Sequence, residues 1–210
     1  MCERVYKALL EKILEGALVP GETIDRSAVK RELQVSLAPI MQALARLASE
    51  GLVEIGAGKS PRVQLARFEE VRGQFALRMA FERQAVTMTS ADRFKCEAER
   101  LRSLAREVDS WPAKDPNAWP AEIAFHMALV DLAGCPMLSE SYRRVVRRNQ
   151  FFSMHSARIN VPRQAAADQP HSRLIDSLCS GNRTEADLAF MKHFAGDLGA
   201  LSRKEGPRES

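Results

Sequence analysis

Hydrophobic residues recur at helical spacing in three stretches within the first fifty residues. In the first stretch Val5, Leu9 and Ile13 share one helix face, and Gly16 follows as a residue that readily adopts the left-handed conformation of a helix C-terminus. The second and third stretches each begin after a residue whose side chain can cap a helix N-terminus. The predicted helices cover residues 3–15, 26–33 and 37–50, with Asp25 and Ser36 as the N-caps of the last two.

A short region of alternating polarity follows the third predicted helix. Residues 52–55 and 62–65 alternate enough to form two strands, and the segment 56–61 between them, with its glycines and proline, is typical of a hairpin loop. Three helices followed by a hairpin are the arrangement of a winged helix-turn-helix. The sequence therefore predicts such a domain over residues 1–67.

From residue 68 onward the pattern is helical almost throughout, with turn residues between the helices. The expected fold is therefore mainly α, with an all-α helical bundle over residues 68–202 behind the winged helix-turn-helix. The charged segment 203–210 contains Gly206 and Pro207 and is expected to be a disordered tail. The predicted helices of the second domain are 68–89, 92–109, 119–133, 137–158, 171–180 and 184–202.

Composition narrows the class of protein further. With 45% hydrophobic and 28% charged residues the chain is typical of a globular protein, and no apolar run approaches the roughly 20 residues of a membrane span. Because the N-terminus carries no signal-peptide core, we expect a cytoplasmic protein without membrane contact. The four cysteines form no Cys-x-x-Cys pair, which excludes a zinc knuckle of that type. The first 67 residues carry ten basic and eight acidic side chains, and this net charge of +2 does not by itself indicate DNA binding.

The N-terminal domain resembles the GntR family of transcription regulators. The family's entry pattern is matched by Ile13, Gly16 and Pro20-Gly21, and its recognition-helix pattern by residues 35–44, Val-Ser-Leu-Ala-Pro-Ile-Met-Gln-Ala-Leu, with the match continuing over 46–53. From residues 78–82 onward the chain is similar to the FadR-type, or FCD, branch, so the resemblance covers nearly the whole chain. It implies a DNA-binding regulator that acts as a homodimer on a two-fold-related operator, and not an enzyme.

The resemblance places the third helix in the major groove of double-stranded DNA. Ser36 and the amides after it are candidates for holding phosphate, although Ser36 can equally serve only as a helix cap. Leu37 and Met41 stand where the family usually has arginines, so the usual bidentate guanine contact is absent. We expect Gln42 and Arg46 to read base edges, with Leu37 or Met41 against thymine methyls. Backbone charge is expected from Arg26, Lys59 and Arg62, with Gly58 beside Lys59 at a wing tip that could otherwise be a solvated loop.

In the FCD branch an Asp-x-x-x-His pair and two later histidines bind a metal ion. Here Glu122 and His126 lie four residues apart, which puts both on one helix face, while His171 and His193 belong to later predicted helices. The resemblance implies that these four residues hold a divalent cation, with Glu122 in place of aspartate. Three imidazoles and a carboxylate suit Zn²⁺, the default expectation, but also Ni²⁺, Co²⁺ or Mn²⁺. Each histidine alone could instead be a hydrogen-bonded core residue, and His155, the fourth, is expected at the surface or lining a pocket.

A cation with open coordination positions could bind an effector, and the expected class is a small carboxylate or sugar acid. Arg78 could pair with the carboxylate of that effector or with Glu82, four residues further on. Two other functions stay open. One is a metal- or ligand-binding protein whose helix-turn-helix no longer reads DNA, in view of Leu37 and Met41. The other is a metal-dependent enzyme, for which the chain offers no separate general base and no substrate-binding motif.

Overall fold

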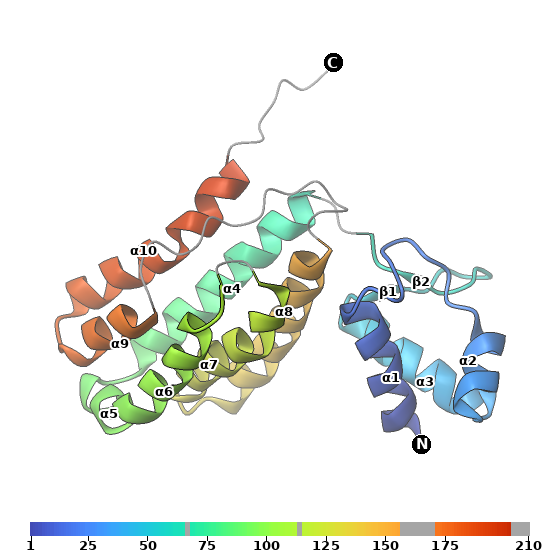
Figure 1. Ribbon diagram of the computed structural model, residues 1–210, viewed down its shortest axis with the longest axis horizontal. Helices are drawn as coiled ribbons and strands as arrows, with labels where there is room; N and C mark the ends of the chain where they lie inside the picture. Colours follow the sequence, from blue (N-terminus) through green and yellow to red (C-terminus); the bar gives the residue numbers. More distant parts are fainter. Residues whose placement is uncertain (66–67, 113–114, 156–170, 203–210) are drawn as a thin grey trace, which may run out of the picture. The chain divides into compact units, whose positions relative to one another are not determined.

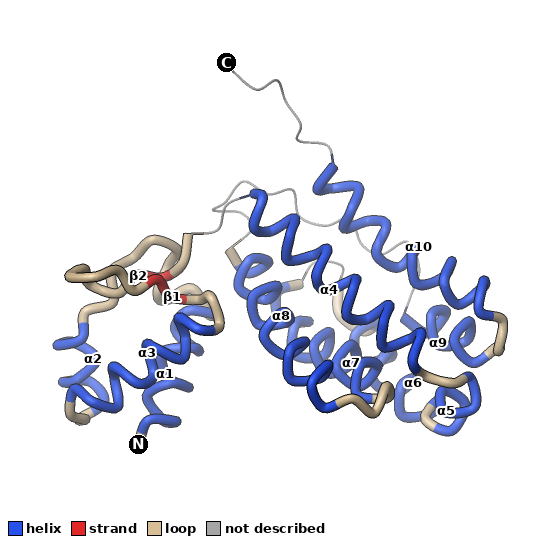
Figure 2. The backbone as a smooth tube through the Cα atoms, turned by 180° about the vertical axis from the view of Figure 1, so that it is seen from behind, coloured by secondary structure: helices blue, strands red, loops and turns tan. Residues whose placement is uncertain are grey.

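The computed structural model describes residues 1–65, 68–112, 115–155 and 171–202, which form two compact units (Figures 1 and 2). The N-terminal unit comprises Met1–Val71 together with Arg147–Asn160, and the helical unit comprises Arg72–Val146 and Val161–Ser210. The N-terminal unit thus includes the last turns of a helix that begins in the helical unit, whereas the sequence pattern suggested a single boundary near residue 67. The expected tail, residues 203–210, lies outside the described residues.

The N-terminal unit has the predicted winged helix-turn-helix fold, with three helices and a small hairpin (Figure 1). The two antiparallel strands are only two residues long each, and Val53 is paired with Val63. Gly16 has the left-handed backbone expected of it, with φ +81°. The elements are α1 (Cys2–Leu14), α2 (Arg26–Leu33), α3 (Leu37–Ser49), β1 (Val53–Glu54) and β2 (Arg62–Val63).

The position of α3 follows from the caps of α2, which precedes it, and from the apolar face of α3 itself. Asp25 caps α2 by accepting a hydrogen bond of 2.8 Å from the backbone N–H of Ser27, and α2 ends at Gln34 in the left-handed conformation, φ 51°. α1 and α3 then bury their apolar faces against each other. The buried residues are Val5, Leu9 and Ile13 of α1 and Ile40, Leu44 and Leu47 of α3. This packing leaves the opposite face of α3 exposed to solvent.

The helical unit contains the remaining elements, as the mainly α prediction required (Figure 2). The single helix expected over 92–109 is wrong in one respect, because the structure breaks it at Glu97, whose backbone leaves the helical region at φ −98° and ψ 4°. No glycine or proline marks that break in the sequence. The elements are α4 (Phe68–Met88), α5 (Ala91–Cys96), α6 (Ala98–Asp109), the 3₁₀-helix η1 (Pro116–Ala118), α7 (Trp119–Asp131), α8 (Pro136–Met154), α9 (His171–Cys179) and α10 (Arg183–Ser202).

The core of the helical unit positions three helices that matter for function. Its largest apolar cluster includes Leu101 of α6, Phe125 of α7, Ile175 of α9 and Phe190 of α10, all fully buried. Burial of these side chains turns one face each of α7, α9 and α10 toward the same interior. Among the helices of the described residues, none is both long and apolar enough to cross a membrane.

Candidate DNA-binding surface and metal centre

The outward face of α3 is apolar over its first two turns. Leu37 is 51% exposed and Met41 is 37% exposed, and Gln42 beside them is the exposed polar side chain of this stretch. Ser36 occupies the N-cap position of α3, but its side chain makes no capping hydrogen bond. The hydroxyl is therefore not used in the cap, which favours the phosphate-holding alternative for Ser36.

Arg46, expected to read bases, lies where α3 packs on α1. Its Nη1 is 2.7 Å from the Glu3 carboxylate, its Nε is 3.4 Å from Glu50, and its guanidinium lies 3.7 Å above the centre of the Tyr6 ring. These contacts hold the guanidinium against the protein. The geometry argues against base contact by Arg46 and leaves Gln42 as the polar candidate on this face.

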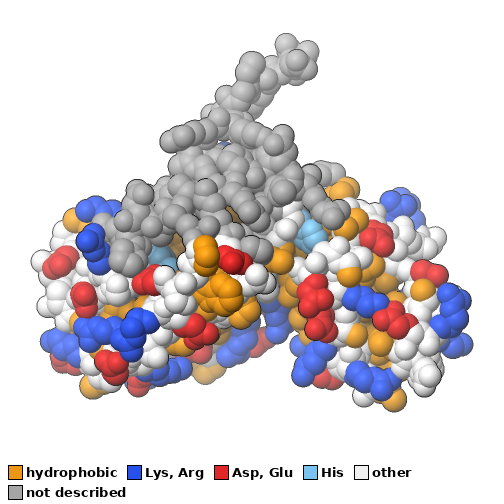
Figure 3. Space-filling view, viewed as in Figure 1, with side chains coloured by type: hydrophobic (Ala, Val, Ile, Leu, Met, Phe, Trp, Pro, Cys, Tyr) orange, Lys and Arg blue, Asp and Glu red, His pale blue; other side chains and the backbone are white. Residues whose placement is uncertain are grey.

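The helix-turn-helix corner carries basic residues that sequence reasoning missed. An open groove of about 610 Å³ is lined by both basic residues of the last turn of α2, by hydroxyl groups and by the turn itself. Its lining residues are Ser27, Lys30, Arg31, Gln34, Val35 and Ser36. Figure 3 shows Lys and Arg side chains on the part of this unit that α2 forms. The signal in the sequence was the run of three basic residues, Arg26, Lys30 and Arg31, within one short helix.

The remaining DNA-binding candidates lie on the wing and at the start of α2. Gly58 has φ +68° at the hairpin tip, no atom lies within 4 Å of the position a Cβ would take there, and Lys59 next to it is exposed. Arg62 is opposite Glu54 in the hairpin register. Arg26 extends from α2 to α3, where its Nη1 lies 3.8 Å from the Met41 sulfur. Arg26, Lys59 and Arg62 are therefore all placed on the N-terminal unit, but only Arg26 contacts the outward face of α3.

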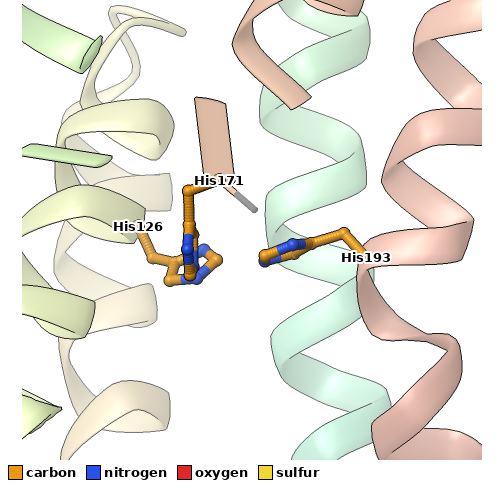
Figure 4. A group of neighbouring side chains, drawn as sticks. All are labelled: His126, His171 and His193. Atoms are coloured by element: carbon orange, nitrogen blue, oxygen red, sulfur yellow. The ribbon is translucent and has the colours of Figure 1, made fainter. Parts of the chain in front are cut away.

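Three histidines from three helices converge inside the helical unit (Figure 4). His126 lies on α7, His171 is the first residue of α9 and His193 lies on α10, and their exposed fractions are 1%, 6% and 7%. Each offers one ring nitrogen, and these three atoms all lie within 4.8 Å of one another. In Figure 4 His193 points from α10 toward the other two rings. That spacing is compatible with a shared metal ion.

Carboxylates accept hydrogen bonds from the Nδ1 atoms of two of these imidazoles. His126 Nδ1 is 2.7 Å from Glu82, a fully buried residue of α4, and His171 Nδ1 is 2.8 Å from Asp109 of α6. A carboxylate accepts a hydrogen bond, so each Nδ1 donates its proton to the carboxylate behind it, and each Nε2 is the nitrogen that can bind a ligand once it carries no proton. This arrangement orients both rings with Nε2 toward the cluster.

The cluster fits a cation, because two of its buried ring nitrogens make no hydrogen bond. They are His126 Nε2 and His193 Nδ1. An unpartnered buried polar atom costs free energy, and such an atom in a native structure calls for an ion, a water or another ligand. Neutral imidazole nitrogens are good ligands for divalent transition metals. The donor set and its unsatisfied atoms therefore match a metal site.

Glu122 lies at the edge of this cluster. Its Oε2 is 3.3 Å from His126 Nε2 and 3.7 Å from His171 Nε2, and the side chain is 28% exposed. The same oxygen is 3.8 Å from Arg78 Nη2. Arg78 itself is buried and paired with Glu82 through Nε at 2.9 Å, so the intramolecular alternative for Arg78 is present in the structure. The fourth expected ligand is thus adjacent to two of the histidines, while the three imidazoles form the compact group.

The electrostatics of the cluster depend on its carboxylates. Burial acts to raise the pKa of Glu82, but the charges of His126 and Arg78 and its hydrogen bonds lower it to about 2. Burial acts to lower the pKa of His171, yet Asp109 and Glu122 raise it to about 9. Burial and the two neighbouring imidazoles hold the pKa of His193 well below its usual range. A cation that binds His171 at neutral pH must therefore displace a proton from it.

The fourth histidine lies elsewhere, and the expectation of a surface position for it is wrong. His155 is 2% exposed in the N-terminal unit, where its Nε2 donates a hydrogen bond of 2.9 Å to the carbonyl oxygen of Ile13. Its burial satisfies the backbone at the end of α1, which the sequence pattern could not show. His155 is therefore a structural residue and a natural control for the other three.

A winged helix-turn-helix followed by an all-α unit is typical of two-domain DNA-binding regulators. The profile of the bacterial regulatory proteins of the gntR family matches residues 2–63, and that of the FCD domain matches residues 74–196. The chain therefore belongs to the GntR family, in the branch that carries an FCD domain. It is a DNA-binding transcription regulator, as the resemblance of its motifs implied.

Several known proteins are similar along most of the chain. The HTH-type transcriptional regulator LutR of Bacillus subtilis is 24% identical over 90% of this chain and 96% of its own. The HTH-type transcriptional repressor RspR of Escherichia coli is 23% identical over 72% and 68%. A solved structure described as a GntR transcriptional regulator, from Rhodococcus sp. RHA1, has a TM-score of 0.69 at 20% identity and covers 96% of this chain and 98% of its own. The structural likeness extends over both units.

Proposed function

We propose that this regulator binds a divalent cation at His126, His171 and His193 and senses a small carboxylate or sugar acid beside it. Binding of that metabolite changes the affinity of a cytoplasmic homodimer for its operator. The finer parts of this proposal are the metal, the effector class and the dimer. They extend the family membership reported above.

One observation carries the metal proposal. Two buried ring nitrogens, His126 Nε2 and His193 Nδ1, make no hydrogen bond, although Glu122 Oε2 lies 3.3 Å from the first. They belong to a cluster in which Glu82 and Asp109 hold the Nδ1 atoms of His126 and His171. Core histidines normally satisfy their ring nitrogens with neighbouring groups. In metal-binding histidines, by contrast, a carboxylate holds one ring nitrogen and the other nitrogen is left for the metal. This cluster has that arrangement at His126.

Zn²⁺ is the default metal, and Ni²⁺, Co²⁺ and Mn²⁺ suit the same donors. When bound, the cation supplies open coordination positions for an oxygen ligand such as a carboxylate. Glu122, at 3.3 Å from His126 Nε2, is near enough to act as a fourth ligand or to yield its place to the effector. Arg78 provides a guanidinium 3.8 Å from Glu122 that could share an anionic effector with the metal.

The DNA-binding part of the proposal uses the outward face of α3. Gln42 contacts base edges and Leu37 contacts thymine methyls, while Ser36 and the basic groove of α2 hold phosphates. Lys59 at the wing tip, with Gly58 and Arg62, adds contacts to the backbone or the minor groove. Arg46 takes no part in base reading because Glu3, Glu50 and Tyr6 hold its guanidinium.

Effector and operator are coupled by linkage. If the metabolite lowers operator affinity by some factor, DNA must lower metabolite affinity by the same factor. This reciprocity distinguishes a regulator from a metal-binding protein that has lost DNA reading, because only the regulator shows both effects. It also gives the proposal a quantitative check that does not depend on knowing the regulated genes.

The metal proposal is tested by measuring bound metal per chain after purification and the affinity for Zn²⁺ by calorimetry. His171→Ala and His193→Ala should each lower the affinity at least 100-fold, because each removes an inner ligand. His155→Gln is the matched control, since it alters the one histidine outside the cluster and keeps a donor for Ile13. Equal metal binding by the wild type and both cluster variants would refute the metal site.

The sensing proposal is tested by gel shift with DNA from upstream of the protein's own gene. Retardation should be specific, and a panel of small carboxylates and sugar acids should include one that changes it in the presence of metal but not after chelation. If specific retardation occurs and no carboxylate alters it in either state, the effector class is wrong. If retardation is never specific, the alternative of a non-reading helix-turn-helix gains support.

A further inference from the structure

The recognition helix lacks a guanidinium on its outward face, but one reaches it from α2. Leu37 and Met41 occupy the exposed positions of the first two turns of α3. Arg26, the first residue of α2, extends across to Met41, with 3.8 Å between its Nη1 and the methionine sulfur. The outward face of α3 therefore carries Leu37 and Met41 beside the polar Gln42, and the guanidinium of Arg26 lies against Met41.

We infer that Arg26 is a base-reading residue that recognises guanine in the major groove, with Met41 as the surface that holds its side chain in place. This inference rests on the groove-reading role of α3 put forward above. It also departs from the sequence-based expectation that Arg26 only supplies charge toward the backbone.

The contact with Met41 leaves the guanidinium able to read a base. A thioether is a weak acceptor, so the one N–H directed at the sulfur is easily given up, and the guanidinium has five donors in all. Guanine presents O6 and N7 in the major groove, and a planar guanidinium pairs with both at once. Because the side chain already lies along α3, less rotamer freedom is lost when it binds.

The comparison with Arg46 shows why Arg26 is the arginine suited to this role. Arg46 is on α3 itself, but two carboxylates and the Tyr6 ring hold its head. Within the described residues, no carboxylate lies at ion-pair distance from the Arg26 guanidinium. A base contact by Arg46 would first break existing ion pairs, whereas one by Arg26 exchanges only a weak contact with sulfur.

Helix stability does not account for the position of Arg26. It lies in the first turn of α2, where a positive charge opposes the helix dipole, and that turn contains no acidic residue. A polar or acidic residue there would stabilise the helix more. The placement is explained if the side chain serves α3 and its ligand rather than α2.

The test begins with selection of operator sequences from random duplex DNA by the full-length wild-type protein. Dissociation constants are then measured for the selected site and for copies in which each guanine is replaced. Arg26→Ala should lower the preference for guanine at one base pair of each half-site by roughly 5- to 150-fold, the range expected of a bidentate arginine–guanine pair. At that position the variant should bind all four base pairs about equally.

Lys30→Ala is the matched control, since it removes the same charge from the same helix. As a phosphate contact it should weaken all sequences alike and reduce the salt dependence of binding by about one counterion, while the base preferences stay unchanged. Met41→Leu keeps the apolar surface but removes the sulfur. It should reduce the guanine preference by a few fold while affinity for the thymine-containing positions stays the same.

Each result decides the inference. If the wild type selects a sequence and Arg26→Ala keeps every base preference while behaving like Lys30→Ala, Arg26 is a phosphate contact and the inference is wrong. If the wild type selects no sequence with or without metal, the groove-reading role of α3 fails, and this inference fails with it. Thermal unfolding of Arg26→Ala within 2 °C of the wild type would show that loss of preference does not reflect unfolding.

Discussion

Each of the two units contains a buried glutamate that accepts a hydrogen bond from a tyrosine and is paired with an arginine. In the N-terminal unit Glu50 accepts a bond of 2.8 Å from the Tyr6 hydroxyl and lies 2.9 Å from Arg147 Nη1. In the helical unit Glu82 accepts from Tyr142 and lies 2.9 Å from Arg78 Nε. The same three residue types thus form a polar network in both places.

The two networks end differently. In the first, Arg147 Nη1 also lies 2.9 Å from the Tyr6 oxygen, so its three members satisfy one another and join α1, the end of α3 and the last turns of α8. In the second, Glu82 has a further partner, His126, whose other ring nitrogen lacks a hydrogen bond. A network whose members satisfy one another stabilises a fold, whereas an unsatisfied nitrogen beside two further imidazoles is consistent with a binding site.

The largest effect is expected when the glutamate of the helical unit is removed. Glu82→Ala removes the carboxylate at 2.9 Å from the buried Arg78 Nε and leaves the Tyr142 and His126 donors unsatisfied. Loss of one partner of a buried pair costs about 3–5 kcal/mol in unfolding free energy. Both tryptophans, Trp111 and Trp119, belong to this unit, so urea unfolding followed by tryptophan fluorescence measures its stability.

The unfolding curve of Glu82→Ala should be the same with and without added chelator. We expect this because the variant no longer holds the His126 ring in place and therefore no longer binds the metal. Glu82→Gln keeps the side-chain volume and serves as the matched comparison. A fluorescence-detected unfolding curve equal to that of the wild type would show that the Glu82 network does not support the helical unit.

A smaller loss is expected at the equivalent position of the N-terminal unit. Glu50→Ala should cost about 2 kcal/mol, because the Tyr6 hydroxyl loses its partner in a buried site. Arg147 has a side chain that is 32% exposed and can be hydrated, whereas that of Arg78 is only 6% exposed. Unfolding followed by far-ultraviolet circular dichroism should show the loss, while the fluorescence transition of the tryptophans stays in place.

The Tyr6 hydroxyl makes the stability of the N-terminal unit depend on pH in the alkaline range. Burial and the hydrogen bond to Glu50 raise the pKa of Tyr6 from 10.0 to about 12. A group whose pKa is higher in the folded state contributes stability below its unfolded pKa and loses it as pH rises to the folded value. Stability should therefore fall between pH 10 and pH 12.

The matched variant for this measurement is Tyr6→Phe. Lysines and the second buried tyrosine, Tyr142, titrate in both proteins, so the difference between the two stability curves isolates Tyr6. We expect the wild type to lose at most about 2 kcal/mol relative to Tyr6→Phe across this range. Parallel curves would contradict the assignment of the raised pKa to this residue.

The elements of both units could be predicted from the sequence because their apolar residues repeat at helical spacing. The carboxylates that hold the imidazoles could not, since they meet the histidines only through packing. Glu82 is 44 residues from His126, and Asp109 is 62 residues from His171. Helical spacing put Glu122 and His126 on one face, but nothing local indicated which carboxylate would hold the outer nitrogen of each imidazole.

The assignment of α3 side chains to DNA or protein met the same limit. The sequence-based hypothesis assigned Arg46 to base edges as a polar residue of the recognition helix. Its actual partner, Glu3, lies 43 residues earlier on α1. Arg26 was identified only as a basic residue, because its reach to Met41 depends on how α2 crosses α3. A helix residue between the buried face and the solvent-exposed face therefore cannot be assigned to protein or DNA from the hydrophobic pattern alone.

The smallest effect is expected for Glu122, which has a less enclosed position than the histidines. Its Oε2 lies within 3.7 Å of two histidine Nε2 atoms, yet the side chain is 28% exposed, so water can replace this carboxylate on a bound cation more easily than it can replace an imidazole. Glu122→Gln should weaken Zn²⁺ binding about tenfold, which corresponds to about 1.4 kcal/mol, compared with at least 100-fold for His171→Ala. Calorimetric titration of both variants with Zn²⁺ measures the ratio.

Glu122→Asp keeps the charge but shortens the side chain by one methylene, so it shows whether the length of the side chain or its charge matters for binding. If Glu122→Gln abolishes binding as completely as His171→Ala, the carboxylate is an obligatory ligand and cannot be the position that an effector displaces.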